Sequence, residues 1–148
     1  DNLRGDLMYK FEEVRIENLV DNASRDLKDE EGTNNISSMA LQLTYDTRDN
    51  IYNPTKGYFV TGGVEDAGGV FSGDKDFIKG TTTAAYYHTF FEKFVLEVKG
   101  RAGMANAYGD SDEVPIYERF FGGGANTIRG YKERRVGPRD PGSDEPIG

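Results

Sequence analysis

The chain has 148 residues, enough for one domain, and its lack of cysteine excludes disulfides and thiolate metal sites. Its formal net charge of −8 argues against nucleic acid as a partner. No signal peptide is visible, and no apolar run approaches the roughly 18 residues of a membrane-spanning helix. The composition of 19 glycines, nine tyrosines and nine phenylalanines in a polar chain favours an all-β protein whose strands have one wet face.

Alternation of apolar and polar residues predicts five strands, over residues 8–19, 39–48, 58–65, 77–91 and 94–104. The pattern does not decide which side of the fourth strand is apolar. In the first strand, Tyr9 and Phe11 share one parity, whereas Val14 and Ile16 share the other. We therefore expect one of two explanations. Either the strand has a bulge, or its upper half stands clear of the lipid that the lower half would contact.

The strand over residues 94–104 indicates which two environments lie on the two sides of the sheet. Three charged residues alternate with its apolar positions, namely Glu97, Lys99 and Arg101. Three adjacent inward charges are too many for the core of a β-sandwich, but they suit the water-filled lumen of a membrane β-barrel. The same alternation recurs in the second and third strands. The predicted lumen-facing wall is Asp46, Glu65, Glu97, Lys99 and Arg101, and the predicted lipid-facing residues are Leu41, Leu43, Tyr45, Val60, Phe94, Leu96, Val98 and Met104.

The connections between the strands alternate between long and short, as an antiparallel up-and-down meander requires. Residues 20–35 and 66–76 are long and polar, whereas residues 49–57 and 92–93 form turns. Outer-membrane barrels have short turns at one end and long loops at the other, with aromatic residues at the membrane interfaces. The aromatic residues of the short-turn end are Tyr45, Tyr58, Phe90, Phe91 and Phe94.

Five strands do not close a membrane barrel, because the smallest such barrels have about eight strands and open edges invite aggregation. We therefore expect a segment from the middle of a larger barrel, cut from a longer protein. Residues 1–106 are expected to form the five-stranded segment of the wall, and residues 107–148 a long extracellular loop.

The chain has two motifs about 70 residues apart. The first is YDTRDN at residues 45–50, followed by NPTKGY at 53–58, and the second is YERFFGGG at residues 117–124, followed by IRGY at 128–131. The first motif resembles the strand–turn–strand signature of the bacterial surface antigen superfamily of BamA-like barrel assembly factors, and the second resembles that family's long sixth extracellular loop with its (V/I)RG(F/Y) motif. The order of the motifs and the strands between them fit the family from about residue 7 to residue 140.

The resemblance implies a 16-stranded transmembrane barrel, preceded by periplasmic POTRA domains, that folds and inserts barrel proteins into the bacterial outer membrane. The implied partners are the outer-membrane bilayer, nascent barrel proteins and, through POTRA domains outside this chain, accessory lipoproteins. No cofactor, metal site or catalytic residue is implied, and we expect the protein not to be an enzyme. This segment would hold about strands seven to eleven and most of the sixth loop.

In that family the sixth loop folds back into the lumen, and its motif arginine meets an acidic residue on a later strand. The resemblance therefore makes Ile128, Arg129, Gly130 and Tyr131 a brace inside the barrel, with the acidic partner outside this chain. A buried guanidinium needs such a partner, and lysine would replace its planar fork poorly. Gly122, Gly123 and Gly124 would let the loop backbone turn sharply and approach the wall.

Other interpretations of the chain remain open at this stage. Within the superfamily, a TamA-like factor or a two-partner secretion pore has a similar loop motif. In a different class, a soluble β-sandwich that binds a ligand would use the apolar side of residues 94–104 as its core. The acidic runs at 26–31 and 110–113 lack the spacing of a calcium loop and are expected to be solvated, and His88 has no second histidine or nucleophile for catalysis.

Overall fold

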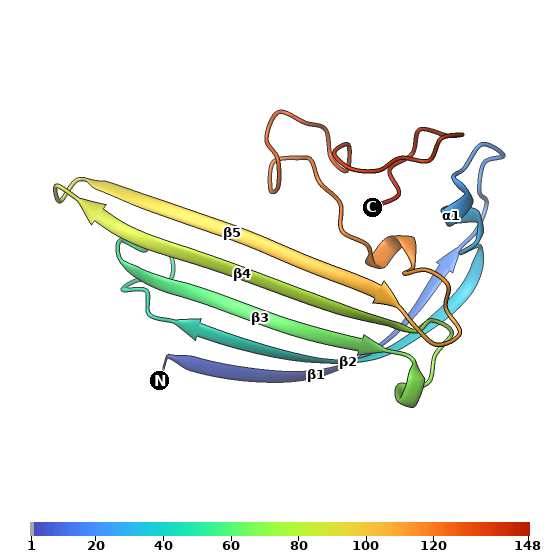
Figure 1. Ribbon diagram of the computed structural model, residues 1–148, viewed down its shortest axis with the longest axis horizontal. Coiled ribbons are helices and arrows are strands. Elements are labelled where there is room, and N and C mark those ends of the chain that lie inside the picture. The colour runs from blue at the N-terminus through green and yellow to red at the C-terminus, as the bar shows by residue number, and fades with distance from the viewer. Residues whose placement is uncertain (1) are drawn as a thin grey trace.

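The computed structural model describes residues 2–148 and shows five long strands in a single antiparallel sheet (Figure 1). The strands pair in the order β1-β2-β3-β4-β5, so that each is hydrogen-bonded to its neighbours in sequence. Their bounds are β1 (Leu3–Ile16), β2 (Gly32–Asp46), β3 (Gly57–Ala67), β4 (Phe77–Phe90) and β5 (Phe94–Ala107). The predicted all-β, up-and-down meander of five strands is confirmed.

The first strand differs from its prediction in both position and character. β1 begins at Leu3 rather than residue 8 and ends at Ile16. Its pairing with β2 keeps one register from Leu3↔Tyr45 to Ile16↔Gly32, so the bulge, one of the two expected explanations, is wrong. The change of parity has another cause, which is that Val14 packs under the long loop on the inner side of the sheet.

Three short helical turns lie in the long connections. They are α1 (Arg25–Lys28), η1 (Gly69–Phe71) and η2 (Ile116–Glu118). In Figure 1, α1 and the segment after β5 lie on one side of the curved sheet, and η1 lies on the other. Across residues 2–148, none of the helical elements has the length and apolar character needed to span a membrane.

The register divides the residues of the sheet between two faces. The chain after β5 lies against the loop end of the inner face, and the outer face is opposite. Exposed apolar side chains dominate the outer face. From β1 to β5 they are Leu3, Leu7, Tyr9, Phe11, Leu41, Leu43, Tyr45, Tyr58, Val60, Val64, Ile78, Phe90, Phe94, Leu96, Val98 and Met104.

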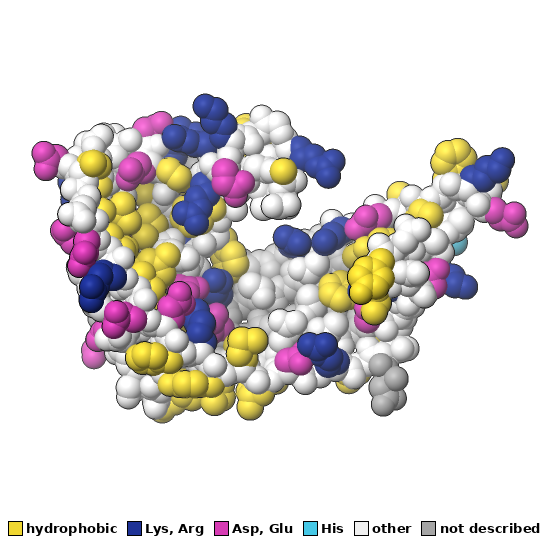
Figure 2. All heavy atoms as spheres, turned by 180° about the vertical axis from the view of Figure 1, so that it is seen from behind, with side chains coloured by type: hydrophobic (Ala, Val, Ile, Leu, Met, Phe, Trp, Pro, Cys, Tyr) yellow, Lys and Arg dark blue, Asp and Glu magenta, His cyan; other side chains and the backbone are white. Residues whose placement is uncertain are grey.

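A small hydrophobic core lies on the inner face, at the end of the sheet with the long loops. Ile36, Ala67 and Phe77 are fully buried there and pack with Val114 of the long loop. Fully burying side chains of the size of Ile36 and Phe77 contributes about 1.5–3 kcal/mol each. This core positions the start of the loop against the wall, while Figure 2 shows an open hollow between the loop and the opposite end of the sheet.

β1 and β5 form the two edges of the sheet. Within residues 2–148 neither edge strand has a second partner strand, and the sheet does not close on itself. The side chains of β5 are mostly exposed on both faces. Open edges of this length favour pairing with further strands.

Candidate functional site: the inner face and the long loop

The five residues predicted to form the polar wall lie on the inner face. Asp46 is in line with Lys99 across the sheet through Phe59 and Ala85, and Glu65 is in line with Ala105 through Lys79. Glu97 accepts a hydrogen bond from Tyr87, at 3.1 Å. Lys99 and Arg101 are exposed, and within residues 2–148 neither forms an ion pair. The eight residues predicted to face lipid lie on the outer face.

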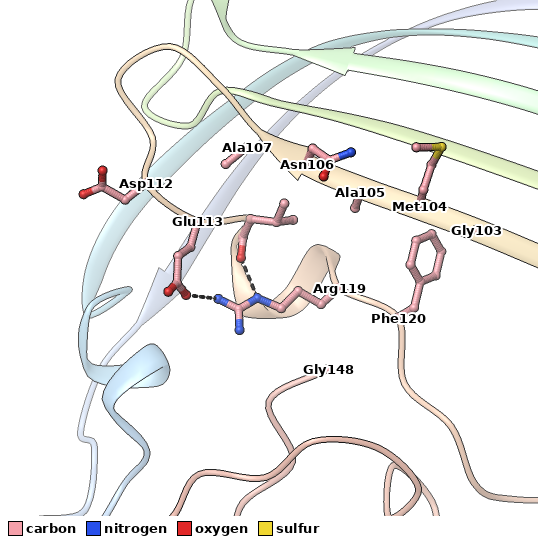
Figure 3. A pocket seen from close by; sticks show the side chains of 11 residues that line it. Gly103, Met104, Ala105, Asn106, Ala107, Asp112, Glu113, Arg119, Phe120 and Gly148 are labelled. Atoms are coloured by element: carbon pink, nitrogen blue, oxygen red, sulfur yellow. Dashed lines mark hydrogen bonds and ion pairs between the residues drawn. The ribbon is translucent and has the colours of Figure 1, made fainter.

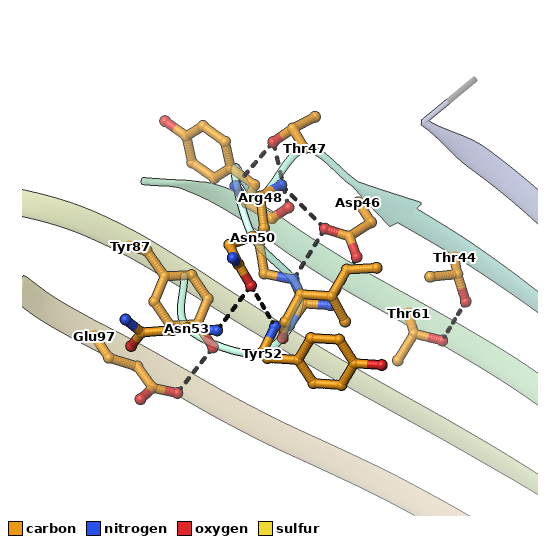
Figure 4. A network of polar contacts seen from close by, with 12 residues as sticks. Thr44, Asp46, Thr47, Arg48, Asn50, Tyr52, Asn53, Thr61, Tyr87 and Glu97 are labelled. Atoms are coloured by element: carbon orange, nitrogen blue, oxygen red, sulfur yellow. Dashed lines mark hydrogen bonds and ion pairs between the residues drawn. The ribbon is translucent and has the colours of Figure 1, made fainter. Parts of the chain in front are cut away.

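The turn between β2 and β3 is held by side chains of the first sequence motif (Figure 4). Arg48 donates to both carboxylate oxygens of Asp46, at 2.9 and 2.7 Å, and its guanidinium lies 4.5 Å from the centre of the Phe59 ring. Asp49 accepts hydrogen bonds from the backbone N–H and hydroxyl of Thr55 and from the N–H of Lys56. These bonds, led by the Thr55 hydroxyl, hold the pKa of Asp49 well below its usual range. The motif therefore builds a rigid turn.

Gly57 leaves no room in this turn for a larger residue. Its φ is +111°, and a Cβ atom there would lie 2.4 Å from the carbonyl oxygen of Thr47. We expect Gly57→Ala to destabilise the full-length protein by about 1–3 kcal/mol, because it adds backbone strain and a clash with another part of the backbone. Urea unfolding in detergent measures the loss.

Gly32→Ala is the matched control, because Gly32 has a similar φ of +114° but no atom within 4 Å of its added Cβ. Gly32→Ala should lower the free energy of unfolding by less than Gly57→Ala does. Equal losses in the two variants would show that the contact with Thr47 is unimportant.

Glu118 fastens the start of the long loop to the inner face. Its carboxylate accepts hydrogen bonds from Lys10 of β1, at 3.1 Å, and from Lys79 of β4, at 2.9 Å. Lys10 also lies 3.4 Å from Glu65 of β3. One carboxylate thus joins two strands that are separated by two others. We call Lys10, Glu65, Lys79 and Glu118 the loop clamp.

The electrostatics of the clamp favour an ionised Glu118. Burial raises the pKa of its carboxyl, but the hydrogen bonds and charges of Lys79 and Lys10 outweigh burial and leave the pKa below its ordinary value. Since the folded pKa is the lower one, this contribution to stability is present above the unfolded value of about 4.3 and is lost as pH falls through the folded pKa.

We therefore expect acidification below about pH 4.3 to loosen the loop, because protonation removes the charge that holds both lysines. A spin label on an Asp112→Cys variant, just before η2, should become more mobile in this range. The same label in a Glu118→Gln background should lack the Glu118 part of the change. An identical pH response in both backgrounds would exclude the clamp as its cause.

Phe120 and Arg119 follow the clamp and tie the loop to β5 and to the first long connection (Figure 3). The Phe120 ring lies over Gly103 so closely that an added Cβ there would be 2.6 Å from it. Arg119 donates to the carbonyl of Val114 at 2.7 Å and to Glu113 at 2.7 Å, and it pairs with Asp26 of α1. A pocket of 560 Å³ remains between β5 and this part of the loop.

A second charged group links three connections at the same end of the sheet. Glu30, which is 7% exposed, forms an ion pair with Lys75 at 2.8 Å and accepts a hydrogen bond from the Tyr117 hydroxyl at 3.4 Å. Burial and the nearby charge of Glu30 raise the pKa of Tyr117, so its hydroxyl stays protonated and can donate. Residues of the acidic run at 26–31 therefore form ion pairs, whereas solvation was expected.

The three loop glycines and the predicted brace lie in a loop closed by the bridge Gly122↔Val136. Gly123 and Gly124 have φ values of +105° and +92°, and added Cβ atoms there would meet Lys132 and Glu133. The N–H of Gly124 donates to the carbonyl of Tyr131 at 3.1 Å. The glycines thus allow the loop to close on itself.

The structure leaves the predicted brace exposed. Ile128 and Tyr131 are 42% and 61% exposed, and Arg129 and Gly130 are also exposed. No hydrogen bond or ion pair joins the Arg129 side chain to another side chain of residues 2–148. Three cations that follow the brace have partners within the loop region, because Arg134 lies over the Phe121 ring and both Arg135 and Arg139 pair with Asp144.

Comparison with known proteins identifies the family of the chain. The Omp85 superfamily domain matches residues 1–148. The chain belongs to the Omp85 superfamily.

Three similar proteins align with most of the chain. It is 39% identical over 141 residues to the outer membrane protein assembly factor BamA of Nitratidesulfovibrio vulgaris, covering 95% of this chain and 18% of that protein. It is 31% identical over 150 residues to the BamA of Neorickettsia risticii, covering 100% and 19%. It is 31% identical over 131 residues to a SAM50-like protein of Schizosaccharomyces pombe, covering 85% and 27%. The chain thus spans only 18% to 27% of the length of these relatives.

The loop clamp of this Omp85 segment was not predicted from the sequence. Glu118 is part of the YERFFGGG motif, but no role was expected for it. Lys79 lies on the strand whose faces the pattern did not separate, and Lys10 lies on the strand with the parity change. Correct faces for those two strands would have placed both lysines on the inner side.

Within residues 2–148 no group of three or more acidic or histidine side chains could hold a metal ion.

Proposed function

We propose that this chain is a mid-barrel segment of an outer-membrane insertase, which folds and inserts β-barrel proteins into the bacterial outer membrane. Residues 1–106 would form part of the wall of a 16-stranded barrel, and residues 107–148 the long extracellular loop that returns toward the lumen. The whole protein would act on nascent barrel proteins and contact accessory lipoproteins through POTRA domains outside this chain.

The observation that supports this proposal best is the contrast between the two faces of one sheet. The outer face exposes large apolar residues along every strand, among them Leu7 at 70%, Phe94 at 69% and Met104 at 65%. The inner face has charged residues and a loop fastened by ion pairs. A sheet with an apolar outside and a polar inside suits a barrel wall between lipid and a polar lumen.

The proposed mechanism involves no covalent step. In the whole barrel, exposed strand edges would template the pairing of an incoming strand, because β-augmentation satisfies backbone groups that lipid cannot. The part of this segment would be mechanical. Its wall would keep the lumen polar, and its clamped loop would hold Arg129 where a carboxylate of a later strand could pair with it.

The other interpretations are less well supported. A soluble β-sandwich would need a second sheet against the outer face, but all five strands of residues 2–148 form one sheet and the chain is an Omp85 domain. A TamA-like factor or a two-partner secretion pore shares the superfamily. Two relatives that align with most of the chain are named BamA, and this favours the insertase.

Reconstitution of the full-length protein tests the proposal. Proteoliposomes that contain it should fold a urea-denatured outer-membrane barrel faster than empty vesicles of the same lipid, as followed by heat-modifiable mobility on gels. A secretion pore would instead move a soluble passenger without accelerating the folding of a barrel. Equal folding rates with and without the protein would contradict the insertase function.

A further inference from the structure

The connection between β3 and β4 folds over the outer face, on the opposite side of the sheet from the long loop (Figure 1). A pocket of 370 Å³ lies between the connection and the outer face. Its lining combines Tyr9, Phe11, Asn35 and Ser37, all on the outer face, with residues 71–74 of the connection. The connection therefore lies beside the surface that the proposed function places against lipid.

Hydrogen bonds fix the shape of this connection. Asp74 accepts from the backbone N–H of Asn35 at 2.7 Å and from its side-chain amide at 3.1 Å, and its own N–H donates to the Asn35 carbonyl at 2.8 Å. Asp76 accepts from the N–H of Gly69 at 2.7 Å and from that of Asp110 at 3.2 Å. The connection is thus a built feature of the surface.

The fixed connection presents apolar side chains outward. Val70 is 88% exposed at the tip of η1, next to the half-buried Phe71. Tyr9 and Phe11 are 59% and 65% exposed on the adjacent strand, and the Tyr9 hydroxyl is bonded to Ser37 at 2.8 Å. Apolar patches of this kind on a fixed surface mark sites of contact with membranes or partners.

The position of these residues along the strands matches a membrane boundary. From Leu3 to Phe11 the outer face of β1 is apolar over about 26 Å of strand, at ~3.3 Å per residue, which covers roughly 20 Å of membrane thickness at the 35–45° tilt of barrel strands. The apolar band of outer-membrane barrels is about 25 Å tall and has aromatic girdles at both edges. The girdle at the turn end includes the stacked rings of Tyr58 and Tyr86, 4.9 Å apart. Phe11 and Phe71 stand near the opposite edge.

The charges of the connection do not offer an electrostatic contact with lipid headgroups. Its one cation in residues 66–76 is Lys75, which is bound to Glu30. Asp66 accepts from the Tyr108 hydroxyl at 2.8 Å, and Asp74 and Asp76 accept the bonds described above. Contact with a membrane would therefore depend on Val70 and Phe71 and would persist at high salt.

We propose that residues 68–76 are an interfacial anchor, in which Val70 and Phe71 enter the lipid surface at the boundary between acyl chains and headgroups. This inference rests on the proposed function, which places the outer face against lipid. The anchor would fix the height of the loop end of β3 and β4 in the outer leaflet.

Depth-dependent quenching tests the anchor in the full-length protein. Variants with single cysteines from Val70→Cys, Met104→Cys or Glu31→Cys are labelled with an environment-sensitive fluorophore, in a background without other reactive cysteines. They are placed in phosphatidylcholine vesicles with a nitroxide on the acyl chain close to the headgroup. We expect emission to be lost at Val70→Cys about as strongly as at Met104→Cys, in low and high salt, and to be unchanged at Glu31→Cys.

The Met104→Cys variant distinguishes failure of the anchor from failure of the proposed function. Quenching there without quenching at Val70→Cys would overturn the anchor and leave the barrel wall standing. No quenching at either position would overturn the placement of the outer face itself. Quenching at Val70→Cys that disappears in high salt would overturn an apolar contact.

Discussion

Replacing Glu118 with lysine in the full-length protein is expected to release the start of the long loop from the wall. Glu118 is the shared partner of Lys10 and Lys79, and the substitution places three cations together. The loss of loop attachment should be on the order of 2–4 kcal/mol, below that of a fully buried pair because Lys10 is 34% exposed. Hydrogen exchange of residues 114–121 measures the loss as faster exchange.

Glu31→Lys is the control for the charge change, because it makes the same change at an exposed position in another loop. Its exchange over residues 114–121 should equal that of the unaltered protein. Glu118→Gln should give an intermediate result, since the amide keeps one acceptor but loses the charge. Unaltered protection in the Glu118→Lys variant would mean that the hydrophobic contacts of Val114 and Phe120 hold the loop without the clamp.

The second large effect is expected for Arg129→Glu in the complete barrel. We propose that Arg129 pairs with a carboxylate of a later strand, and the substitution would set two negative charges against each other inside the lumen. Removing one partner of a buried pair costs about 3–5 kcal/mol. The barrel should lose its heat-modifiable mobility at a lower temperature, and assembly of substrate barrels should fall.

Arg129→Lys keeps the charge but not the planar fork, so its defect should be smaller than that of Arg129→Glu. Arg129→Ala should lie between the two in barrel stability. The exposed Arg25→Glu, on α1, controls for the change in net charge. Normal mobility and normal substrate assembly in the Arg129→Glu variant would contradict the role of Arg129 as a brace.

Period-two alternation predicted which residues share a face in strands whose two faces differ clearly in polarity along their whole length. In β5 the apolar side from Phe94 to Met104 and the charged side from Glu97 to Arg101 appear as the pattern indicated. β4 was harder because its outer face includes Gly80, Thr82 and Ala84, whose hydropathy differs little from that of the inner threonines. The pairing of β4 with β3 and β5 determines which of its residues lie on each face, and this pairing cannot be read from the sequence of one strand.

The first strand shows how tertiary contacts override the pattern. Tyr9 and Phe11 are apolar because they lie on the outer face, whereas Val14 is apolar because the long loop covers the inner face at that height. Apolar residues of one strand thus lie on opposite faces for two different reasons. Alternation within the strand could not distinguish this from a bulge, since both shift the apolar parity.

The long loop was the least predictable part of the chain. Its conformation depends on partners that are far away in sequence, such as Lys10 and Glu118, separated by 108 positions. The glycines near Gly123 could be recognised as turn residues, but the bridge that closes them needs Val136. Motif resemblance located the loop, and only the folded chain revealed the residues that fasten it.

Chemical cross-linking in native membranes tests most directly that the long loop lies against the inner face of the wall. In the full-length protein, Gly103→Cys and Phe120→Cys together should be joined in high yield by a short bis-maleimide, because Phe120 lies on Gly103. Val98→Cys with Phe120→Cys, on the opposite face of the same strand, should not be joined. Linkage of the Val98 pair, or no linkage of the Gly103 pair, would contradict the account.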